Sequence, residues 1–572
     1  MRIVLGCMRL STDPERDEGR ALRTMRAALD AGIVAFDTAR AYGLDQDDAG
    51  HNERLVAAAR PSRVITKCGM RREQGAWIPD GRARHVASDI AASVAALGGL
   101  PIDTLLLHAP DPRTSLATTG RALARALEGG HAKRVGASNV SRKQLEELLE
   151  QVPISSVQVA IGAYDDLAIR AGVVGLCIER GIEVLAHAPL GGPARSQRLV
   201  KDQVLREIAA RAPDPRPTPI EVFLAYLLAV SEHLVPVVGA RRPETIASLV
   251  AASRLALGED DMLALDRRFP VLGALRRPPP ARAAGARTRE VVMMMGVPGA
   301  GKSTAAEALV ARGYERLNRD SLGGTLRGIA RRLDDHLREG KDRFVLDNTY
   351  VSRATRSDVL RVAHAHGADV RCVFFDTPPH EARINIVLRI LHRFGGLLSP
   401  EELVARSRED PAALAPSALQ RMTRDLEAPA GDEGFASIET VAFVRQHPPE
   451  RGRPGVAIAL DAGAEAIAHA VSSSPAGAAC LVLGWRPEPG GDAHRDAEAL
   501  VTRIASESSR LVELALCTHP AGPPICWCRP PQPGLWLAFA RRHGVDPRES
   551  YFAGRAVSDR ALAVAFGLPF EA

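Results

Sequence analysis

The feature that most constrains the fold is a regular alternation in the first 270 residues. Short apolar segments of strand length alternate there with stretches long enough for a helix, such as GRALRTMRAALDAG and SRKQLEELLEQV. Eight β-then-α units over roughly 250 residues are typical of a (β/α)₈ TIM barrel. A doubly wound open sheet is the alternative, but it rarely carries eight regular units on one chain. The eight expected strands are 2–7, 34–37, 63–67, 104–108, 134–138, 156–160, 183–188 and 235–240.

Two stretches rich in proline and arginine divide the chain of 572 residues. RPPPARAAGARTR contains three consecutive prolines, and HPPERGRPG lies about 160 residues further on, so both are typical of exposed linkers. At roughly 150 residues per domain, this length fits several domains. We expect a barrel at 1–275, a linker at 276–289, a second α/β domain at 290–446 and a third domain at 455–572.

Composition excludes several broad classes of protein. With 46% hydrophobic and 25% charged residues, the chain is an ordinary globular protein and not a disordered one. No apolar run reaches the roughly 18 residues of a membrane span, and the N-terminus lacks the apolar core of a signal peptide. The net charge of +6 is too small to argue for nucleic-acid binding by itself. We expect a cytoplasmic protein with no membrane partner, and the sequence carries no indication of its oligomeric state.

Four polar residues stand at the ends of barrel strands, where active sites of this fold lie. Asp37, Lys67 and His108 end the second, third and fourth strands, and Tyr42 follows Asp37 by five residues. A lysine beside a tyrosine lowers the phenol pKa, a carboxylate would hold that lysine, and a histidine can orient a carbonyl oxygen. Any one of them could be a structural ion pair or a strand cap. Together they favour a proton-donating site.

The segments that carry these residues resemble the aldo-keto reductases over residues 1–270. They are LGCMRLS, AGIVAFDTARAYG, ITKCG, LLLHAPD, VGASNVS, APLGG and VPVVGARRPETI. The resemblance implies reduction of a small aldehyde or ketone with NADPH, with Tyr42 as the acid. Arg241, beside a 2′-phosphate, would favour NADP. The implied cofactor residues are Ser138, Asn139 and Gln158 at the carboxamide, His187 in place of a stacking tyrosine, and Gly239 and Arg241 at the phosphates.

The second domain opens with VVMMMGVPGAGKST, which is an apolar strand, a glycine-rich loop and the start of a helix. This is a P-loop in its proper context, because glycines let backbone N–H groups wrap phosphates and the helix N-terminus adds positive potential. Lys302 would reach the β- and γ-phosphates of ATP, and Ser303 would bind Mg²⁺. The expected phosphate-binding residues are Gly296, Gly299, Gly301, Lys302, Ser303 and Thr304.

Four further residues concern the transfer of the phosphoryl group to its acceptor. Asp320 follows the first helix and can take a proton from an attacking hydroxyl. Asp347 ends an apolar strand, where a nucleotide-site carboxylate is expected. Arg383 and Arg389 follow CVFFD on a helix and can close over the transferred group, although a solvated helix face is the simpler alternative.

The motifs GVPGAGKST, NRDSLG, VLDNTYVSRATR and EARINIVLR resemble the 5′-hydroxyl polynucleotide kinases over residues 290 to about 395. This resemblance implies Asp320 as the base, Arg383 as a lid arginine, Arg356 as a contact to nucleic acid, and a 5′-OH end of RNA or DNA as acceptor. Related P-loop kinases act on small molecules or proteins. A small-molecule enzyme that reduces and phosphorylates one metabolite therefore stays open, as does a binding protein that senses a cofactor.

The last domain contains four soft metal ligands as two close pairs, Cys517-x-His519 and Cys526-x-Cys528. They fit tetrahedral Zn²⁺ and leave no position for water, which favours a structural site. Four unconnected buried residues are the alternative.

The segment around these ligands resembles the zinc-containing branch of the haloacid-dehalogenase (HAD) phosphatases. The resemblance implies a HAD-like Rossmannoid fold with Asp461 at the nucleophile position. Several functional positions depart from that pattern. The second carboxylate of the nucleophile motif is replaced by Gly463, a lysine by Pro530, and a metal-binding aspartate by Arg555, while Asp559 remains. We therefore expect an inactive phosphatase-like tail.

Overall fold

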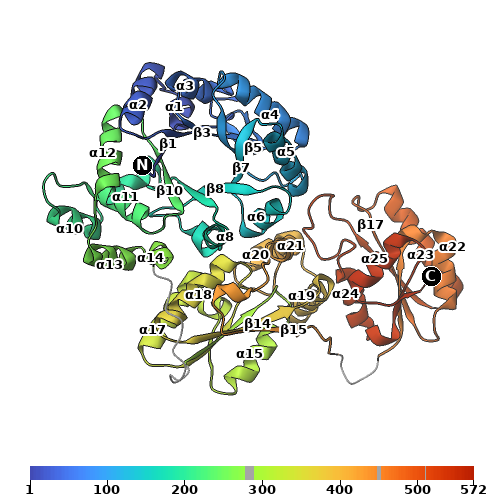
Figure 1. Cartoon of the computed structure of the whole chain (residues 1–572). Coiled ribbons are helices and arrows are strands. Elements are labelled where there is room, and N and C mark those ends of the chain that lie inside the picture. Colours follow the sequence, from blue (N-terminus) through green and yellow to red (C-terminus); the bar gives the residue numbers. More distant parts are fainter. Residues whose placement is uncertain (277–288, 447–451, 509, 572) are drawn as a thin grey trace. The chain divides into compact units, whose positions relative to one another are not determined.

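The structure, a computed structural model, describes residues 1–276, 289–446, 452–508 and 510–571 (Figure 1). It divides into two compact units, Met1–Ala281 and Arg282–Ala572. Apart from its two end residues, the predicted linker 276–289 lies outside the described residues. The predicted second and third domains both fall within the second unit. Among the described residues, no helix combines the length and the apolar character that a membrane span requires.

The first unit is built on a closed barrel of eight parallel strands, which confirms the predicted fold. Around the barrel the order is β1-β10-β9-β8-β7-β6-β3-β2. Every one of the eight predicted strands is present. Their bounds are β1 Val4–Gly6, β2 Ala35–Asp37, β3 Arg63–Cys68, β6 Ile102–Leu107, β7 Ala132–Ser138, β8 Ile154–Ala160, β9 Glu183–His187 and β10 Leu234–Gly239.

Successive side chains along each barrel strand point alternately into the barrel and toward the helices, so they form two apolar layers. Val4 and Leu106 belong to a cluster made of strand residues alone, which fills the barrel interior. Ile3, Leu5 and Leu107 join the larger cluster that includes the surrounding helices. The helices are α1 Arg9–Thr12, α2 Glu18–Asp30, α3 His51–Ala59, α4 Ala83–Ala96, α5 Leu116–Glu128, α6 Arg142–Leu149, α7 Leu167–Arg170, α8 Val173–Glu179, α9 Gly192–Val200, α10 Gln203–Arg211, α11 Pro219–Ala229, α12 Pro243–Arg254, α13 Glu259–Arg268 and α14 Pro270–Arg276.

A hairpin that the alternation does not predict follows β3. Its strands β4 Met70–Glu73 and β5 Ala76–Pro79 pair antiparallel, and Gln74 and Gly75 form the two-residue turn. Both turn residues have positive φ, 49° and 80°, as a type I′ hairpin turn requires. The hairpin places Trp77 beside the strand ends that carry the predicted acid site.

The second unit contains two five-stranded sheets. The first sheet is entirely parallel in the order β12-β13-β11-β14-β15, with the strands β11 Glu290–Met295, β12 Glu315–Leu317, β13 Arg343–Asp347, β14 Asp369–Asp376 and β15 Ser437–Ala442. Alternate residues of β11 belong to different apolar clusters on its two faces. The helices of this region are α15 Lys302–Val310, α16 Arg319–Leu322, α17 Leu326–Arg338, α18 Arg353–Ala365, α19 Pro379–Phe394, α20 Pro400–Arg406 and α21 Pro416–Arg424.

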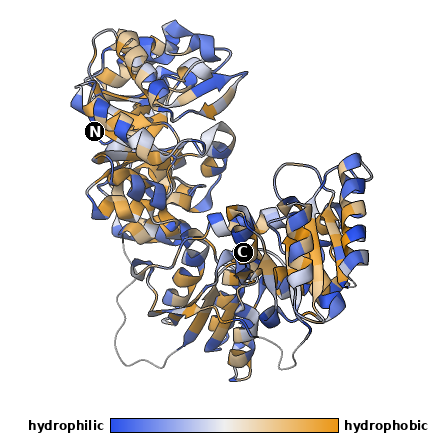
Figure 2. Cartoon of the chain, turned by 90° about the vertical axis from the view of Figure 1, so that its right-hand side faces the viewer, coloured by the Kyte–Doolittle hydropathy of each residue, from blue (hydrophilic) through white to orange (hydrophobic). Residues whose placement is uncertain are grey.

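The second sheet of this unit is also parallel, in the order β18-β17-β16-β19-β20. Its strands are β16 Gly455–Ala459, β17 Ala479–Trp485, β18 Leu511–Cys517, β19 Tyr551–Ala553 and β20 Phe570–Glu571, and its helices are α22 Ala464–Ser473, α23 Asp492–Ser508, α24 Gly534–His543 and α25 Val557–Phe566. One apolar cluster runs from α19 to α24 and α25, so the two sheets share a core. Figure 2 shows mainly orange strands inside the units and blue stretches on the outer helices.

Candidate functional sites

The four predicted acid-site residues meet at the carboxyl end of the barrel. The Lys67 Nζ lies 2.7 Å from Asp37 Oδ1 and 3.0 Å from the Tyr42 hydroxyl, and it also donates to the carbonyl of Thr38. The Tyr42 and His108 rings meet edge to face with centroids 5.7 Å apart. All four side chains are buried. The arrangement is a phenol held by an ammonium group, which is in turn held by a carboxylate.

Burial sets the protonation of this group. It raises the pKa of Tyr42 to about 12, so the expectation that Lys67 would lower this pKa is wrong for the net value: the Lys67 ammonium does act to lower it, but burial has the larger effect. Burial opposes the charge on Lys67, but Asp37 and Tyr42 outweigh it and raise the lysine pKa. Burial, with Lys67 second, holds the pKa of His108 well below its ordinary value. At neutral pH the site therefore combines a protonated phenol, a charged lysine and a neutral histidine.

Four residues expected at a nicotinamide ring gather at neighbouring strand ends. Ser138 and His187 end β7 and β9, and Gln158 of β8 donates to Asp37 Oδ1 over 2.7 Å. Asn139 has a positive φ of 56° and donates to Ser138 Oγ over 3.1 Å. His187 Nε2 lies 3.3 Å from Asn139 Oδ1. These polar groups line one side of the Tyr42 site, where a carboxamide could be held.

The two residues expected at the cofactor phosphates lie at the end of β10 and just beyond it. Gly239 ends β10 and pairs in register with Gly6 of β1. Arg241 is half-exposed and forms an ion pair with Asp13, which also pairs with Arg9 at 3.1 Å. A phosphate at Arg241 would have to compete with the Asp13 carboxylate.

The β4–β5 hairpin adds an aromatic wall that the sequence did not predict. The Trp77 ring lies 6.0 Å from Tyr42 and 5.7 Å from His108, measured between centroids. The Arg72 guanidinium stacks on the Trp77 ring, 4.0 Å from its centroid. Trp77 is 40% exposed, so it borders the acid site and solvent at once.

The P-loop and most of the residues predicted for phosphoryl transfer line one cavity of about 1150 Å³. Gly299 and Gly301 adopt φ of 83° and 93°, which favour glycine, and a Cβ on Gly299 would come within 2.6 Å of the Ala382 carbonyl. Asn385 of α19 donates to the Gly299 carbonyl over 2.7 Å. The predicted residues that line the cavity are Gly299, Gly301, Lys302, Ser303, Thr304, Asp320, Asp347 and Arg389.

Lys302 turns back onto its own loop. Its Nζ donates to the carbonyls of Gly296 and Val297 over 2.9 and 2.8 Å. Burial lowers the pKa of Lys302 to about 8, against an opposing effect of Asp347. The lysine is therefore poised to gain stabilisation from an anion in the cavity.

Asp320 and Asp347 are brought together by a pair of asparagines. Asn318 caps α16 and donates to the carbonyl of Asp347, while Asn348 accepts a bond of 2.8 Å from the Arg319 amide. Asp347 is buried and ion-paired with Arg316, whereas the Asp320 side chain is 44% exposed and faces the cavity. The geometry leaves Asp320 accessible to an acceptor.

The arginines that line the cavity are not all the ones that were predicted to act on the phosphoryl group or the acceptor. Arg389, Arg319, Arg408 and Arg445 line the cavity, whereas Arg383 is absent from the described residues that line it, so its catalytic role stays a prediction. The expected contact of Arg356 with nucleic acid is wrong. Its side chain is fully buried and forms a bidentate ion pair with Glu433, in which both hydrogen bonds are 2.7 Å long.

The four soft ligands of the tail form a compact group. Cys517 Sγ lies 3.5 Å from His519 Nδ1, 3.7 Å from Cys526 Sγ and 3.4 Å from Cys528 Sγ, and His519 Nδ1 lies 3.1 Å from Cys528 Sγ. All four donor atoms lie within 4.8 Å of one another. A tetrahedron with bonds of about 2.3 Å has edges of about 3.8 Å, so this donor set fits Zn²⁺.

The phosphatase-like positions are occupied by other interactions. The Asp461 carboxylate, 77% exposed, is paired with Arg486 at 2.8 Å. Asp559 is buried and accepts from the amides of Arg555 and Ala556 over 2.9 Å each, which caps α25. A carboxylate committed to these amides is poorly placed to bind a catalytic metal.

Comparisons with known proteins match two parts of the chain. Residues 2–268 match the aldo/keto reductase family, and residues 291–429 match a family described as an AAA domain. Residues 2–268 form an aldo/keto reductase domain. A 6-dehydroglucose reductase of Agrobacterium fabrum is 26% identical over 280 residues, 45% of this chain and 90% of that protein. A pyridoxine 4-dehydrogenase of Escherichia coli is 27% identical over 279 residues, 46% of this chain and 93% of that protein.

One solved structure is an aldo/keto reductase from Klebsiella pneumoniae in complex with NADP and acetate. It is 20% identical, covers 47% of this chain and 91% of that chain, and has a TM-score of 0.40.

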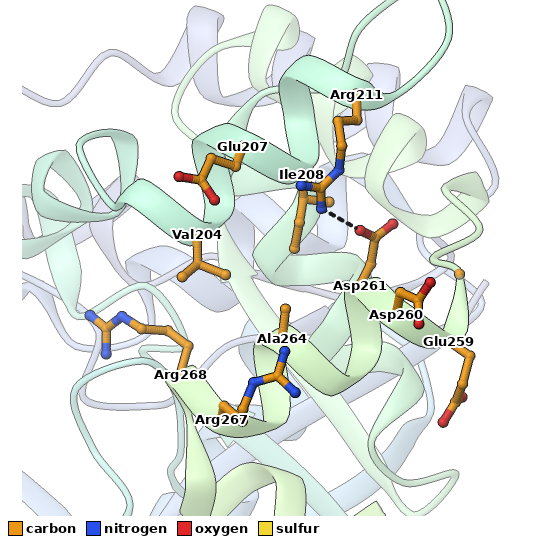
Figure 3. Close-up of a pocket in the computed structure, with 11 residues that line it drawn as sticks. Val204, Glu207, Ile208, Arg211, Glu259, Asp260, Asp261, Ala264, Arg267 and Arg268 are labelled. Atoms are coloured by element: carbon orange, nitrogen blue, oxygen red, sulfur yellow. Dashed lines mark hydrogen bonds and ion pairs between the residues drawn. The ribbon is translucent and has the colours of Figure 1, made fainter.

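The aldo/keto reductase domain has a further hollow of about 890 Å³ between α10 and α13 (Figure 3). Charged side chains of both signs border it, and Arg211 bonds Asp261 across it at 2.8 Å. None of the predicted catalytic residues lines it. The predicted acid site therefore lies elsewhere in this domain.

Proposed function

We propose that the aldo/keto reductase domain reduces an aldehyde or ketone with NADPH. The observation that carries this proposal is the buried chain from Asp37 through Lys67 to the Tyr42 hydroxyl at the barrel mouth. Ser138, Asn139, Gln158 and His187 would hold the nicotinamide, and Gly239 and Arg241 would hold the phosphates. When bound, NADPH supplies the hydride.

Tyr42 supplies the proton in this proposal. Its phenol stays protonated at neutral pH because burial raises its pKa to about 12. As negative charge develops on the carbonyl oxygen, the proton moves from Tyr42 to that oxygen and Lys67 stabilises the phenolate left behind. Neutral His108 orients the carbonyl, and Trp77 shields the site from water.

The test is NADPH oxidation against a broad panel of aldehydes and ketones. The Tyr42→Phe variant should lose turnover by about 10²-fold or more while it still binds NADPH, because only the acid is removed. Tyr551→Phe, in the second unit, serves as the matched control and should keep wild-type turnover. Equal turnover of the Tyr42 variant and the wild type would reject the assignment.

We further propose that the P-loop domain transfers the γ-phosphate of ATP to a 5′-hydroxyl of RNA or DNA. The shared cavity of Lys302, Ser303, Asp320 and Asp347 supports phosphoryl transfer. The motifs that resemble those of 5′-hydroxyl polynucleotide kinases, and the arginines that line the cavity, favour a nucleic-acid end as acceptor.

Within this proposal each residue has one task. Lys302 and the loop amides bind the β- and γ-phosphates, and Ser303 would hold Mg²⁺, which neutralises phosphate charge when bound. Asp320 accepts the proton of the attacking hydroxyl, and Arg389 stabilises charge on the transferred group. Asp347 keeps the loop that carries Asp320 in place.

Transfer of labelled γ-phosphate from ATP and Mg²⁺ to 5′-OH oligonucleotides, RNA and DNA in parallel, tests this activity. Asp320→Ala should abolish labelling but retain ATP binding, and Asp335→Ala on the exposed face of α17 is the matched control. If ATP binds but neither oligonucleotide is labelled, the nucleic-acid proposal falls, and a screen of small-molecule acceptors is the next test.

For the tail we propose a structural Zn²⁺ site and no phosphatase activity. Cys517, His519, Cys526 and Cys528 would supply all four ligands, so no coordination position is left for a reacting water. Metal analysis should find about one zinc per chain, and phosphate monoesters should not be hydrolysed. Zinc-free protein that keeps the same fold, or clear phosphatase turnover, would contradict this proposal.

A further inference from the structure

The predicted zinc loop carries a buried tryptophan that reaches into the P-loop domain. Trp527 lies between two of the metal-ligating cysteines and is only 1% exposed. Its indole N–H donates to the backbone carbonyl of Leu414 over 2.8 Å. This bond joins residues 113 positions apart and connects the tail to the segment between α20 and α21.

That segment forms part of the wall of the phosphate cavity. The cavity-lining residues of this wall are Ser407, Arg408, Glu409, Asp410, Pro411 and Leu414. Two arginines of α19 hold its other end: Arg393 pairs with Asp410 at 2.8 Å, and Arg389 donates to the carbonyl of Pro411 over 3.3 Å. The wall is therefore fastened to α19 on one side and to Trp527 on the other.

Close packing around Trp527 attaches the tail to the P-loop domain. Gly534, the first residue of α24, donates to the carbonyl of Trp527 over 3.0 Å. A Cβ at Gly534 would lie 2.4 Å from that carbonyl and 3.1 Å from Leu397, which precedes α20. The α24 and α25 helices share an apolar cluster with α19, the helix whose Asn385 holds the P-loop.

We propose that the metal-ligating loop of the tail, through Trp527, positions the wall 407–414 of the nucleotide cavity. Trp527 is a positioning residue in this proposal, and the phosphatase-like domain serves as a support for the kinase site. The link to nucleotide binding rests on the proposed phosphotransferase function. The structural link between the metal-ligating loop and the wall 407–414 does not depend on that function, because it rests only on the contacts of Trp527 and Gly534 described above.

Hydrogen exchange of the full chain tests the structural link without any nucleotide. The zinc-loaded protein is compared with the same protein after chelation, and again after Zn²⁺ is added back. Amides of residues 407–424 should exchange about fivefold or more faster without the metal and recover on its return, while α18, on the opposite face of the sheet, stays unchanged. Unchanged exchange in 407–424 would overturn the proposal.

Two tryptophan variants distinguish loss of the Trp527–Leu414 hydrogen bond from a general destabilisation of the tail. Trp527→Phe keeps an aromatic ring but removes the N–H that bonds Leu414. Trp536→Phe makes the same change at a buried tryptophan of the same cluster whose indole N–H has no partner among the described residues. Only Trp527→Phe should speed exchange in 407–424, with the zinc content of both variants unchanged.

Nucleotide affinity gives the functional readout, measured with a fluorescent ATP analogue. Trp527→Phe should bind it about 3- to 10-fold more weakly than wild type, as expected for the loss of one buried hydrogen bond, and Trp536→Phe should match wild type. Equal effects of the two variants would overturn the proposal. If the wild-type protein binds no nucleotide, the phosphotransferase proposal fails, and the exchange experiment still decides the structural link.

Discussion

The ammonium nitrogen of Lys67 lies 3.0 Å from the hydroxyl oxygen of Tyr42 inside the barrel mouth. This contact decides what kind of acid Tyr42 can be. Burial alone would make loss of the phenol proton very unfavourable, and the fixed positive charge of Lys67 offsets part of that cost. In the proposed reaction, the proton would therefore stay on Tyr42 until a carbonyl oxygen develops enough negative charge to take it.

Replacement of Lys67 by methionine should lower the rate of carbonyl reduction by about 10²- to 10⁴-fold. The side chain keeps its length, but the phenolate formed during the reaction loses its counter-charge, and Asp37 is left buried without its ion-pair partner. Single-turnover kinetics with saturating NADPH measure the loss. Lys133→Met, at an exposed lysine of β7, is the control and should react as wild type.

The same contact predicts a level pH profile for the wild-type enzyme. The pKa of Tyr42 is raised to about 12 and that of Lys67 is raised as well, so neither group changes protonation between about pH 6 and 9. Carbonyl reduction should therefore be independent of pH in this range. A rate that falls steadily from pH 7 to 9 would show that another group donates the proton.

In the proposed function, the preference for NADPH over NADH would depend on Arg241, which is ion-paired with Asp13. Arg241→Ala should weaken NADPH binding by about tenfold or more and change NADH binding little, because only NADPH carries the 2′-phosphate. Asp13→Asn should strengthen NADPH binding, since the competing carboxylate is removed. Fluorescence titration with both cofactors measures the ratio, and Arg242→Ala is the neighbouring control. Parallel losses for NADPH and NADH would place Arg241 away from the 2′-phosphate.

The barrel could be predicted from the sequence because each strand is a short local signal and the repeat specifies how the strands close. The β4–β5 hairpin was missed for an equally local reason. Its turn is Gln74-Gly75, without the asparagine or aspartate that usually marks such a turn. The glycine at 75 with alternating residues on each side is the signal that was available.

The acid site could be predicted because its residues follow strand ends, which a parallel barrel brings together. Contacts between distant segments could not. Arg356 and Glu433 are 77 residues apart, and a helical arginine in a sequence looks the same whether it is solvated or buried. Trp527 shows the same limit, because its bond to Leu414 depends on how two sheets pack.

Nucleotide binding at the P-loop should take up protons. The pKa of Lys302 is lowered to about 8 in the free protein, and phosphate oxygens would restore its charge. ATP affinity should therefore fall as the pH rises above about 8, and about half a proton should be taken up per ATP bound near that pH. Calorimetry in buffers of different ionisation enthalpy measures this uptake.

Two lysine variants check the source of that proton. Lys302→Arg stays charged over the whole range, so its remaining ATP binding should show no linked uptake. Lys341→Met, at an exposed lysine, should keep the uptake of the wild type. Proton uptake that persists in Lys302→Arg would assign it to another group.

Burial of the Arg356–Glu433 pair makes it a structural element of the second unit. Both side chains are about 1% exposed, and Arg356 also donates to the carbonyls of Tyr350 and Glu427 over 3.2 and 2.9 Å. Arg356→Met leaves Glu433 charged and unpaired, which should lower the free energy of unfolding by about 3–5 kcal/mol. Arg338→Met breaks only surface ion pairs, with Asp334 and Asp335, and should cost less than about 1 kcal/mol.

Urea unfolding monitored by tryptophan fluorescence reports on this change, because three of the four tryptophans, Trp485, Trp527 and Trp536, lie in the second unit. Glu433→Gln added to Arg356→Met removes the stranded charge and should recover part of the lost stability. If Arg356→Met unfolds at the wild-type urea concentration but no longer binds oligonucleotides, Arg356 is a surface contact after all. If Arg356 is a structural residue, the variant should instead be destabilised, and its remaining folded fraction should bind oligonucleotides normally. This is the expected result, because a side chain without solvent access cannot reach a phosphate.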